Sequence, residues 1–257
     1  MAEKIGFAAE SQQPAPRNSV VQVYFAGRNM TLAYYNDRFD LHRGDMVYVE
    51  GKLEGMRGCV VDVNYNFKIK VSDYRRVIAR VDTDVHGQFF LAGSHFLTFD
   101  RAALPGSRVL PWFRAPAAGE ETFVTGSDGT VFRLDDLQGM QVNRAIAERG
   151  HNYYMENRVR YLSLDGARGY AIVEGRNAYE VEFLHDAGEI RDLVCSCICS
   201  YTCKHEVATM LQLRDLLARI ETHYADEYAR AGYFAAIDRE TLLAFALNGK
   251  ETGSITL

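Results

Sequence analysis

The chain has 257 residues, of which 47% are apolar and 12% aromatic, and this composition is typical of a folded globular protein with one or two domains. No apolar run approaches the roughly 18 residues that a membrane-spanning helix needs. The net charge of −5 excludes a strongly basic protein that binds nucleic acid through its overall charge.

The charge is unevenly distributed along the chain. Residues 19–115 contain 13 Lys/Arg against 10 Asp/Glu, a net of +3, whereas residues 116–257 contain 14 against 22, a net of −8. Residues 1–18 are rich in Ser, Gln, Pro and Ala and predict a flexible arm. We therefore expect three parts: an arm at 1–18, a mildly basic domain at 19–115 and an acidic domain at 116–257.

Short β-type runs follow the arm. They lie at 20–25, 30–35, 46–50 and 59–63 and are separated by turns that contain glycine. Further strands are expected at 77–81, 88–91 and 95–99. This pattern favours a small antiparallel β-barrel of the SH3-like or OB-like (oligonucleotide-binding) kind. The prolines between Pro105 and Pro116 suggest a linker, in which we expect Trp112 to be buried.

The stretch 64–76 interleaves aromatic and cationic residues, and residues 52–80 carry 7 cations against 3 anions. One interpretation is a surface for single-stranded nucleic acid, in which aromatic rings stack on bases and four cations contact phosphates: Lys68, Lys70, Arg75 and Arg76. The alternative is a β-hairpin with a solvated basic face. It would place alternate residues on the core side: Tyr65, Phe67, Ile69 and Val71.

The acidic domain begins with a helical stretch at 143–149, which Gly150 is expected to stop. A β-meander follows, with turns at Gly166, Gly175 and Gly188 and a last strand at 190–197. Apolar residues at helical spacing predict a helix over 207–220. A final short helix is expected through Leu247, with Asp238 as its N-cap. The fold class is therefore α+β.

Four cysteines and a histidine lie within residues 195–205. In an extended segment, residues i and i+2 point to the same side, so Cys195 and Cys197 can present two thiolates to one point. Cys203 and His205 can close on that point from across a short loop. Three thiolates and one imidazole form a closed tetrahedral set that suits Zn²⁺ and leaves no open position, which indicates a structural site. Loss of the metal should then release the following helix from the sheet.

Two other interpretations of these cysteines are less favoured. Disulfides suit an oxidising compartment, whereas no leader with a charged and then an apolar stretch is evident at 1–16, so we expect a reducing, cytoplasmic setting. A catalytic pair of Cys203 and His205 is disfavoured because residues two apart are poorly placed for a thiol-to-imidazole hydrogen bond. Phosphate-cradling loops, nucleotide fingerprints and nucleophile elbows are also missing from the sequence, so we expect no enzyme.

The pattern C-x-C-x5-C-x-H before a helix resembles the SWIM zinc finger, whose ligands lie on a ββα unit. The likeness covers about residues 149–217 and includes Arg149-Gly-His-Asn-Tyr-Tyr154 and Tyr179-Glu-Val-Glu-Phe183. A second register, Cys197-x-Cys199-x3-Cys203-x-His205, also satisfies the pattern; we prefer the first, because three residues leave little room to turn back to one metal. The resemblance implies DNA binding and protein contacts.

Two functions follow as expectations. The first is a non-catalytic adaptor that binds DNA or RNA, in which Lys204 is the cation within the motif best placed to touch an anion. The second is a scaffolding factor whose acidic half meets a basic protein partner without contacting nucleic acid. The net charge of −8 on residues 116–257 favours the scaffolding function for the zinc module itself, because phosphates are repelled by net negative charge. The oligomeric state is left open.

Overall fold

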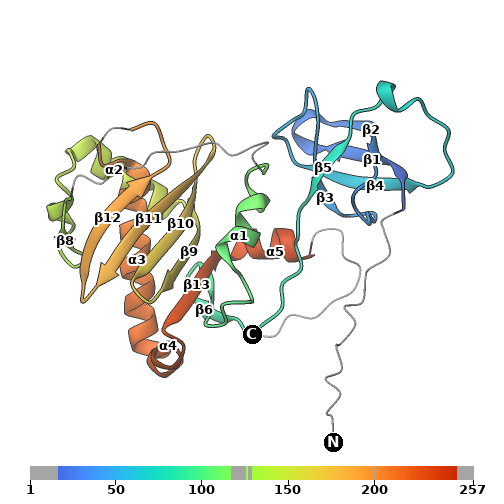
Figure 1. Cartoon of the computed structure of the whole chain (residues 1–257). Coiled ribbons are helices and arrows are strands. Elements are labelled where there is room, and N and C mark those ends of the chain that lie inside the picture. The colour runs from blue at the N-terminus through green and yellow to red at the C-terminus, as the bar shows by residue number, and fades with distance from the viewer. Residues whose placement is uncertain (1–16, 117–125, 127–128, 200, 248–257) are drawn as a thin grey trace, which may run out of the picture. The chain divides into compact units, whose positions relative to one another are not determined.

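A computed structural model describes residues 17–116, 126, 129–199 and 201–247, which form two compact units (Figure 1). The smaller unit comprises residues 17–54 and 58–80. The larger unit comprises residues 55–57 and the described residues from 81 onwards. Of the flexible arm expected at 1–18, residues 1–16 lie outside the described part of the chain.

The smaller unit is built on a five-stranded sheet in the order β2-β1-β4-β3-β5, in which every paired ladder is antiparallel. Val21 and Val23 of β1 and Val60 of β4 are fully buried, as suits β-branched side chains on a pleated surface. Asn29 takes the left-handed conformation, with φ 47°, that connects β1 to β2. The strands are β1 (Ser19–Phe25), β2 (Met30–Asn36), β3 (Met46–Val49), β4 (Gly58–Asn64) and β5 (Val77–Arg80).

The described residues do not form the closed barrel that the sequence predicted. The edge strands β2 and β5 meet at an isolated parallel bridge between Tyr35 and Arg76, where the Tyr35 N–H donates to the Arg75 carbonyl at 2.9 Å. Because β5 has only four residues and pairs with β3, no continuous ladder joins it to β2. The sheet is therefore bridged at one point and otherwise open.

The hairpin considered for 64–76 is likewise absent from this unit. The Asn64 side chain accepts the N–H of Asn66 at 2.8 Å, which turns the chain as soon as β4 ends. A loop and a short 3-10 helix (Val71–Asp73) follow. Tyr65 and Val71 are consequently exposed, while Phe67 packs edge-on against Tyr35 with ring centroids 6.2 Å apart. The expected alternation is therefore kept only in part: Phe67 and Ile69 are half-buried and Lys68 and Lys70 are exposed, but the segment forms no strand.

The larger unit contains an eight-stranded antiparallel sheet in the order β6-β7-β13-β9-β10-β11-β12-β8. The predicted meander is confirmed as β9 (Val159–Asp165), β10 (Arg168–Glu174), β11 (Ala178–Asp186) and β12 (Glu189–Cys195), except that the last strand ends at Cys195 and does not reach Cys197. Gly166 and Gly188 turn between these strands with positive φ. The other strands are β6 (Phe90–Ala92), β7 (His95–Thr98), β8 (Phe132–Arg133) and β13 (Tyr233–Asp238).

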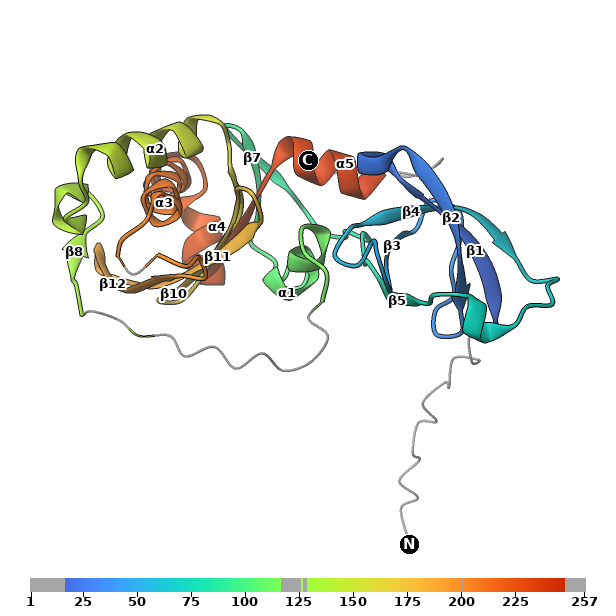
Figure 2. The ribbon, with the colours of Figure 1, turned by 90° about the horizontal axis from the view of Figure 1, so that it is seen from above.

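One face of this sheet is covered by α3 (Lys204–His223), and α2 (Arg144–Met155) packs on the other side of α3, as Figure 2 shows. The buried stripe of α3 enters the main core cluster, where it meets apolar side chains of β9, β10 and β11. That stripe includes Val207, Met210, Leu213, Leu216 and Ile220. A shorter helix, α4 (Ala225–Ala231), follows α3 and ends at Gly232, which has φ 58°.

Gly150 lies inside α2 and does not stop it, contrary to the sequence prediction. A Cβ at this position would lie 2.5 Å from Cβ of Val207, so the glycine allows α2 and α3 to pack closely. The helix gains an N-cap from Asn143, whose side chain accepts the Ile146 N–H at 3.0 Å. Tertiary contact therefore outweighs the local helix-breaking tendency of glycine, which costs about 1 kcal/mol.

The boundary between the two units falls near residue 80, whereas we expected it near residue 115. Strands β6 and β7 pair within the larger sheet. The expected linker is packed: Trp112 is fully buried, stacks on Phe245 with ring centroids 4.8 Å apart and donates its indole N–H to the Asp82 carbonyl. It lies beside the short helix α1 (Gly106–Val109).

The last helix, α5 (Arg239–Leu247), confirms the prediction of an N-cap at Asp238, whose carboxylate accepts the Thr241 N–H at 2.9 Å. The strand before it, β13, was not predicted. It lies between β7 and β9, and all six of its residues are buried. A late segment of the chain thus completes the middle of the sheet.

Candidate metal centre

The structure brings together the four ligand residues of the preferred register: Cys195, Cys197, Cys203 and His205. Their candidate ligand atoms all lie within 4.8 Å of one another. Cys195 ends β12, Cys197 lies in the turn beyond it, and Cys203 and His205 lie at the start of α3. The cluster therefore joins the sheet to the first turn of the helix that covers it and could hold a metal ion.

Two of the distances between candidate ligand atoms match those of a tetrahedral metal site. With metal–sulfur bonds of about 2.3 Å and metal–nitrogen bonds of about 2.0–2.1 Å, a tetrahedron places sulfur and nitrogen ligands about 3.6 Å apart. The Sγ atoms of Cys195 and Cys203 lie 3.6 and 3.5 Å from Nδ1 of His205. Cys203 and His205 are thus within hydrogen-bonding distance, contrary to the expectation that residues two apart are poorly placed for this contact. This geometry indicates that Nδ1 is the nitrogen that faces the metal position.

Backbone hydrogen bonds fix the strand side of the cluster. Val181 of β11 pairs with Cys195, and the next residue, Ser196, donates its N–H to the Glu180 carbonyl at 2.9 Å. The Ser196 hydroxyl in turn accepts the Glu180 N–H at 2.9 Å. The chain is thus held to β11 until the turn that carries Cys197.

A capping box fixes the helix side. The Glu206 carboxylate accepts the Cys203 N–H at 2.6 Å, and the Cys203 sulfur accepts the backbone N–H of Glu206. Cys203 is therefore both the N-cap of α3 and a candidate ligand. The positive end of the helix dipole favours a thiolate at this position.

Aromatic residues enclose the His205 ring. Tyr179 stacks on it with centroids 4.2 Å apart, and Tyr153 meets it edge-on at 5.5 Å. On the side away from the thiols, a Cβ at Gly175 would lie 3.5 Å from Nε2, which is buried without a hydrogen-bond partner in the described structure. The sequence predicted a turn at Gly175 and no role for Tyr153 or Tyr179, because these residues are not metal ligands and their spacing carries no signal.

Burial sets the protonation of the ligands. It lowers the pKa of His205 to about 4, with a smaller contribution from the neighbouring Lys204 charge. The imidazole is therefore neutral near pH 7, which is the form that binds metals. Burial raises the pKa of Cys197 to about 12. The pKa of Cys203 is raised mainly by a hydrogen bond with Cys195 and also by burial. A cation is needed to stabilise these thiols as thiolates.

Cys199, the spare thiol, is exposed and lies outside the group of four. Its side chain and backbone both lie within hydrogen-bonding reach of the Cys197 sulfur. All five cysteines have free thiols, including Cys59 in the smaller unit.

The cations of the expected nucleic-acid surface have different environments. Lys68, Lys70 and Arg75 are exposed on the loop between β4 and β5. Arg76, by contrast, forms an ion pair with Asp37 and lies over the Tyr35 ring at 5.3 Å. In the larger unit, the Lys204 ammonium lies over the Tyr153 ring at 4.6 Å. Arg76 and Lys204 are therefore engaged within the fold.

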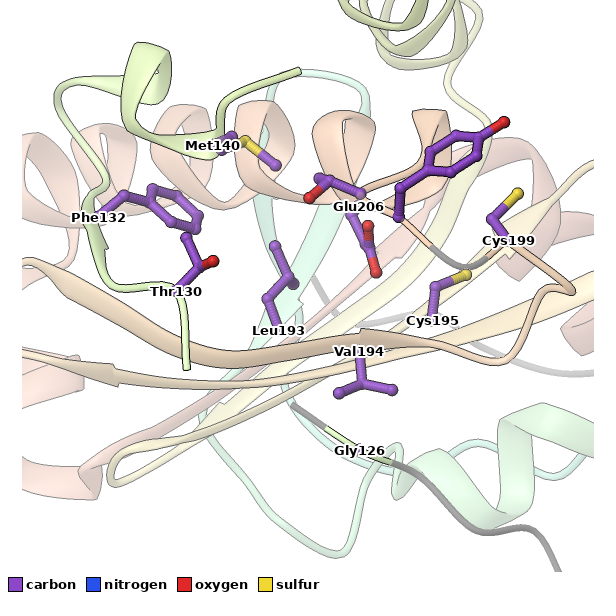
Figure 3. Close-up of a pocket in the computed structure, with 11 residues that line it drawn as sticks. Gly126, Thr130, Phe132, Met140, Leu193, Val194, Cys195, Cys199 and Glu206 are labelled. Atoms are coloured by element: carbon purple, nitrogen blue, oxygen red, sulfur yellow. The ribbon is translucent and has the colours of Figure 1, made fainter. Parts of the chain in front are cut away.

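A hollow of about 200 Å³ adjoins the metal cluster (Figure 3). Cys195 and Cys199 lie at one end of it, and Glu206 reaches into it from the first turn of α3. Its other walls include Leu193 and Val194 of β12.

Comparisons with protein-family models, with curated proteins and with solved structures found no match to this chain. Among the described residues, none of the helices has the length and apolar character needed to cross a membrane. The site is therefore interpreted from its own geometry, which defines a possible metal-binding module.

Proposed function

We propose that this protein is a zinc-binding, non-catalytic module in which the metal joins the sheet to α3. The observation that carries the proposal is the grouping of three cysteine sulfurs and one histidine nitrogen within 4.8 Å. A fourfold protein ligand set leaves no position for a reacting water, which favours a structural role. The C-x-C-x5-C-x-H pattern supports membership of the SWIM type, and a reducing setting such as the cytoplasm would keep the thiols available.

Metal analysis of protein purified without chelator tests this proposal. We expect about one zinc per chain, as one closed tetrahedral site requires. Replacement by Co²⁺ should give the absorption of tetrahedral cobalt with sulfur-to-metal charge transfer. Protein that contains no zinc and does not take up cobalt would contradict the proposal.

We further propose that the loop between β4 and β5 contacts single-stranded nucleic acid. It carries the exposed cations Lys68, Lys70 and Arg75, together with the rings of Tyr65 and Tyr74, of which Tyr65 is exposed. Cations that track phosphates and rings that stack on bases are the combination that single-strand binders use. Arg76 is left out because of its ion pair with Asp37.

Binding of the zinc-loaded protein to single-stranded DNA and RNA across a salt series tests this surface. Each contacted phosphate contributes about −0.7 to the slope of log K against log salt, so alanine at Lys68, Lys70 and Arg75 should reduce the slope by about 2. The matched control changes three other exposed cations of the same unit to alanine: Arg28, Arg43 and Lys52. Equal reductions of the slope in both triple variants would contradict a specific surface. Absence of binding at low salt would contradict any contact between this loop and nucleic acid.

Contact with a protein partner is the second candidate function. It is favoured by the turn between the ligands, where Ile198 is fully exposed and Tyr201 is 65% exposed. The −8 balance of residues 116–257 favours a basic partner. A scaffolding factor of this kind would bind protein without a strong response to added oligonucleotide.

A further inference from the structure

Cys199 is a thiol that the proposed zinc centre does not use. It is exposed, whereas Cys195 and Cys197 are half-buried and Cys203 is buried. A reagent that arrives from solvent therefore meets Cys199 before it meets any sulfur of the ligand set. Because oxidation of a thiol depends on its exposure, Cys199 is the first site of modification to consider among these four residues.

Cys199 also lies close to one of the ligand sulfurs. Its side chain and its backbone are both within hydrogen-bonding reach of the Cys197 sulfur. Cys197 lies in the turn after β12, and Cys199 directly follows that turn. Consecutive Cα atoms are about 3.8 Å apart, so two residues on either side of a bend meet the range of about 4.4–6.8 Å that a disulfide requires. A bond between these two sulfurs needs no movement of other elements.

The hollow of about 200 Å³ gives small molecules access to this end of the cluster. Cys195 and Cys199 both line it, and Figure 3 shows their sulfurs on the same side. Its volume falls below the roughly 300–1,000 Å³ of typical small-molecule sites, so it suits a reagent of a few atoms better than a cofactor. A water molecule occupies about 30 Å³ in the liquid, and hydrogen peroxide, with two oxygen atoms, therefore fits.

The charge of the cluster selects among oxidants. Three thiolates around one divalent ion leave a net charge of −1, which repels anionic oxidants. The Lys204 ammonium does not offset this charge at the hollow, because it lies over the Tyr153 ring. An uncharged hydroperoxide is the class of oxidant that this end of the cluster admits.

We propose that Cys199 is a redox-sensitive thiol: when a hydroperoxide oxidises it, Cys199 forms a disulfide with Cys197, and this disulfide releases zinc. The inference rests on the proposed zinc centre and adds a regulation of the same site. Cys199 is the residue that meets the oxidant, and Cys197 is the residue that resolves the oxidised form.

The chemistry takes two steps and transfers two electrons. The Cys199 sulfur first attacks one oxygen of hydrogen peroxide, whose O–O bond breaks, so that Cys199 becomes a sulfenic acid and one water is released. The Cys197 thiolate then attacks that sulfur: the S–S bond forms, the S–O bond breaks, and the hydroxide that leaves takes up a proton as a second water. The peroxide is thus reduced to water, and the two sulfurs are oxidised to a disulfide.

Loss of Cys197 from the ligand set opens the site. Cys195, Cys203 and His205 remain, which are two thiolates and one imidazole in place of a closed set of four. Zinc is then held more weakly, because a disulfide sulfur is not a thiolate ligand. Val207 of α3 still lies in the core cluster, so the change is confined to the first turn of the helix. A dithiol reductant with added zinc should restore the site.

Release of zinc from the full-length, zinc-loaded protein in hydrogen peroxide tests the inference. A chromophoric zinc indicator measures the rate, and mass spectrometry of alkylated peptides identifies the disulfide. Cys199→Ser and Cys199→Ala are the informative variants, because they remove the spare thiol and leave the four ligands in place. Cys59→Ser, which removes the free thiol of the smaller unit, is the matched control.

We expect the wild type and Cys59→Ser to release zinc at the same rate as the disulfide between Cys197 and Cys199 forms. Dithiothreitol with added zinc should reverse both changes. The two Cys199 variants should release zinc at least about fivefold more slowly, because the remaining thiols of the cluster are shielded by burial.

Three results would overturn the inference: equal rates of zinc release in the wild type and the Cys199 variants, a disulfide that does not include Cys199, or loss of zinc from Cys199→Ser before oxidant is added, which would make Cys199 a ligand. Each can occur while the wild type contains zinc, in which case the metal centre stands and only the redox role fails. Wild-type protein that is purified under reducing conditions and contains no zinc would overturn both proposals.

Discussion

His205 is positioned by residues that contribute no ligand. Tyr179 stacks on its ring, Tyr153 meets its edge, and Gly175 leaves room beside Nε2. Because the ring is enclosed on these sides, Nδ1 faces the sulfurs of Cys195 and Cys203. Such surrounding residues tune a metal site by about 10–100-fold in affinity when they are changed.

The choice between Cys195 and Cys199 as ligand is testable by substitution. We expect Cys199→Ser to retain zinc, because its exposed thiol lies outside the cluster, and Cys195→Ser to lose more than about tenfold in zinc affinity. Competition with a chromophoric chelator measures both. The opposite order of affinities would assign the ligand set to Cys197, Cys199, Cys203 and His205.

His95 predicts a dependence of stability on pH. It is buried in β7, and its Nε2 contacts the Val159 carbonyl at 2.9 Å. Burial lowers its pKa below the ordinary value of 6.5, although that contact and the charge of Asp238 oppose the shift. The unfolded chain therefore binds the proton more readily, so stability present above about pH 6.5 is lost as the pH falls.

Urea unfolding of zinc-loaded wild type and His95→Gln at several pH values checks this prediction. Acidification from about pH 7 to about pH 5.5 should destabilise the wild type by up to about 1.4 kcal/mol per pH unit more than the variant. Zinc release at low pH destabilises both proteins, so its effect cancels in the difference between their free energies of unfolding. Parallel curves would show that His95 does not contribute.

At the scale of elements, α3 is held both by its buried stripe and by the cluster at its first turn. Val207, Met210 and Leu213 enter the core cluster, independently of any metal. Loss of zinc should therefore loosen mainly the first turn of α3. This effect is smaller than the release of the whole helix that the ligand spacing alone predicted. The α2–α3 contact at Gly150 is the other constraint on this end of the helix.

Gly150→Ala should destabilise the larger unit by about 1–3 kcal/mol. The new Cβ would lie 2.5 Å from Cβ of Val207 and 3.1 Å from the Lys204 carbonyl oxygen, and overpacking of this kind outweighs the gain in helix propensity. Urea unfolding measures the change. Glu148→Ala, at an exposed position of the same helix, should remain within about 0.5 kcal/mol of the wild type. A stabilised Gly150→Ala variant would show that the helices separate at little cost.

At the scale of the whole molecule, the described chain has two compact units, and each buries apolar side chains of its own. The metal cluster lies entirely within the larger one. Each unit is large enough to unfold as a cooperative body, so their responses to metal removal should differ.

Calorimetry with and without chelator tests this division. We expect two transitions, of which chelation lowers only one, because zinc binding adds to the stability of the unit that holds the ligands. The Cys203→Ser variant should reproduce the chelated pattern and show no further response to chelator. A single transition that moves as a whole would indicate that the units unfold together.

Features that depend on neighbours along the chain could be predicted from the sequence. The ligand spacing of Cys195, Cys197, Cys203 and His205 predicted the cluster. The glycine turns predicted the meander β9–β12, the apolar periodicity predicted α3, and Asp238 predicted the start of α5. Each of these follows from local backbone preference or from periodicity over one element, which a single sequence contains.

The remaining features depend on contacts between distant parts of the chain. The place of β13 between β7 and β9, the transfer of β6 and β7 to the larger sheet and the open edge of the smaller sheet depend on pairing between distant segments. Gly150 is helical because Val207 lies against it, and Arg76 is engaged because Asp37 lies beside it. Strand order and side-chain partners are set by contacts between residues far apart in the chain, and local propensity carries no information about those contacts.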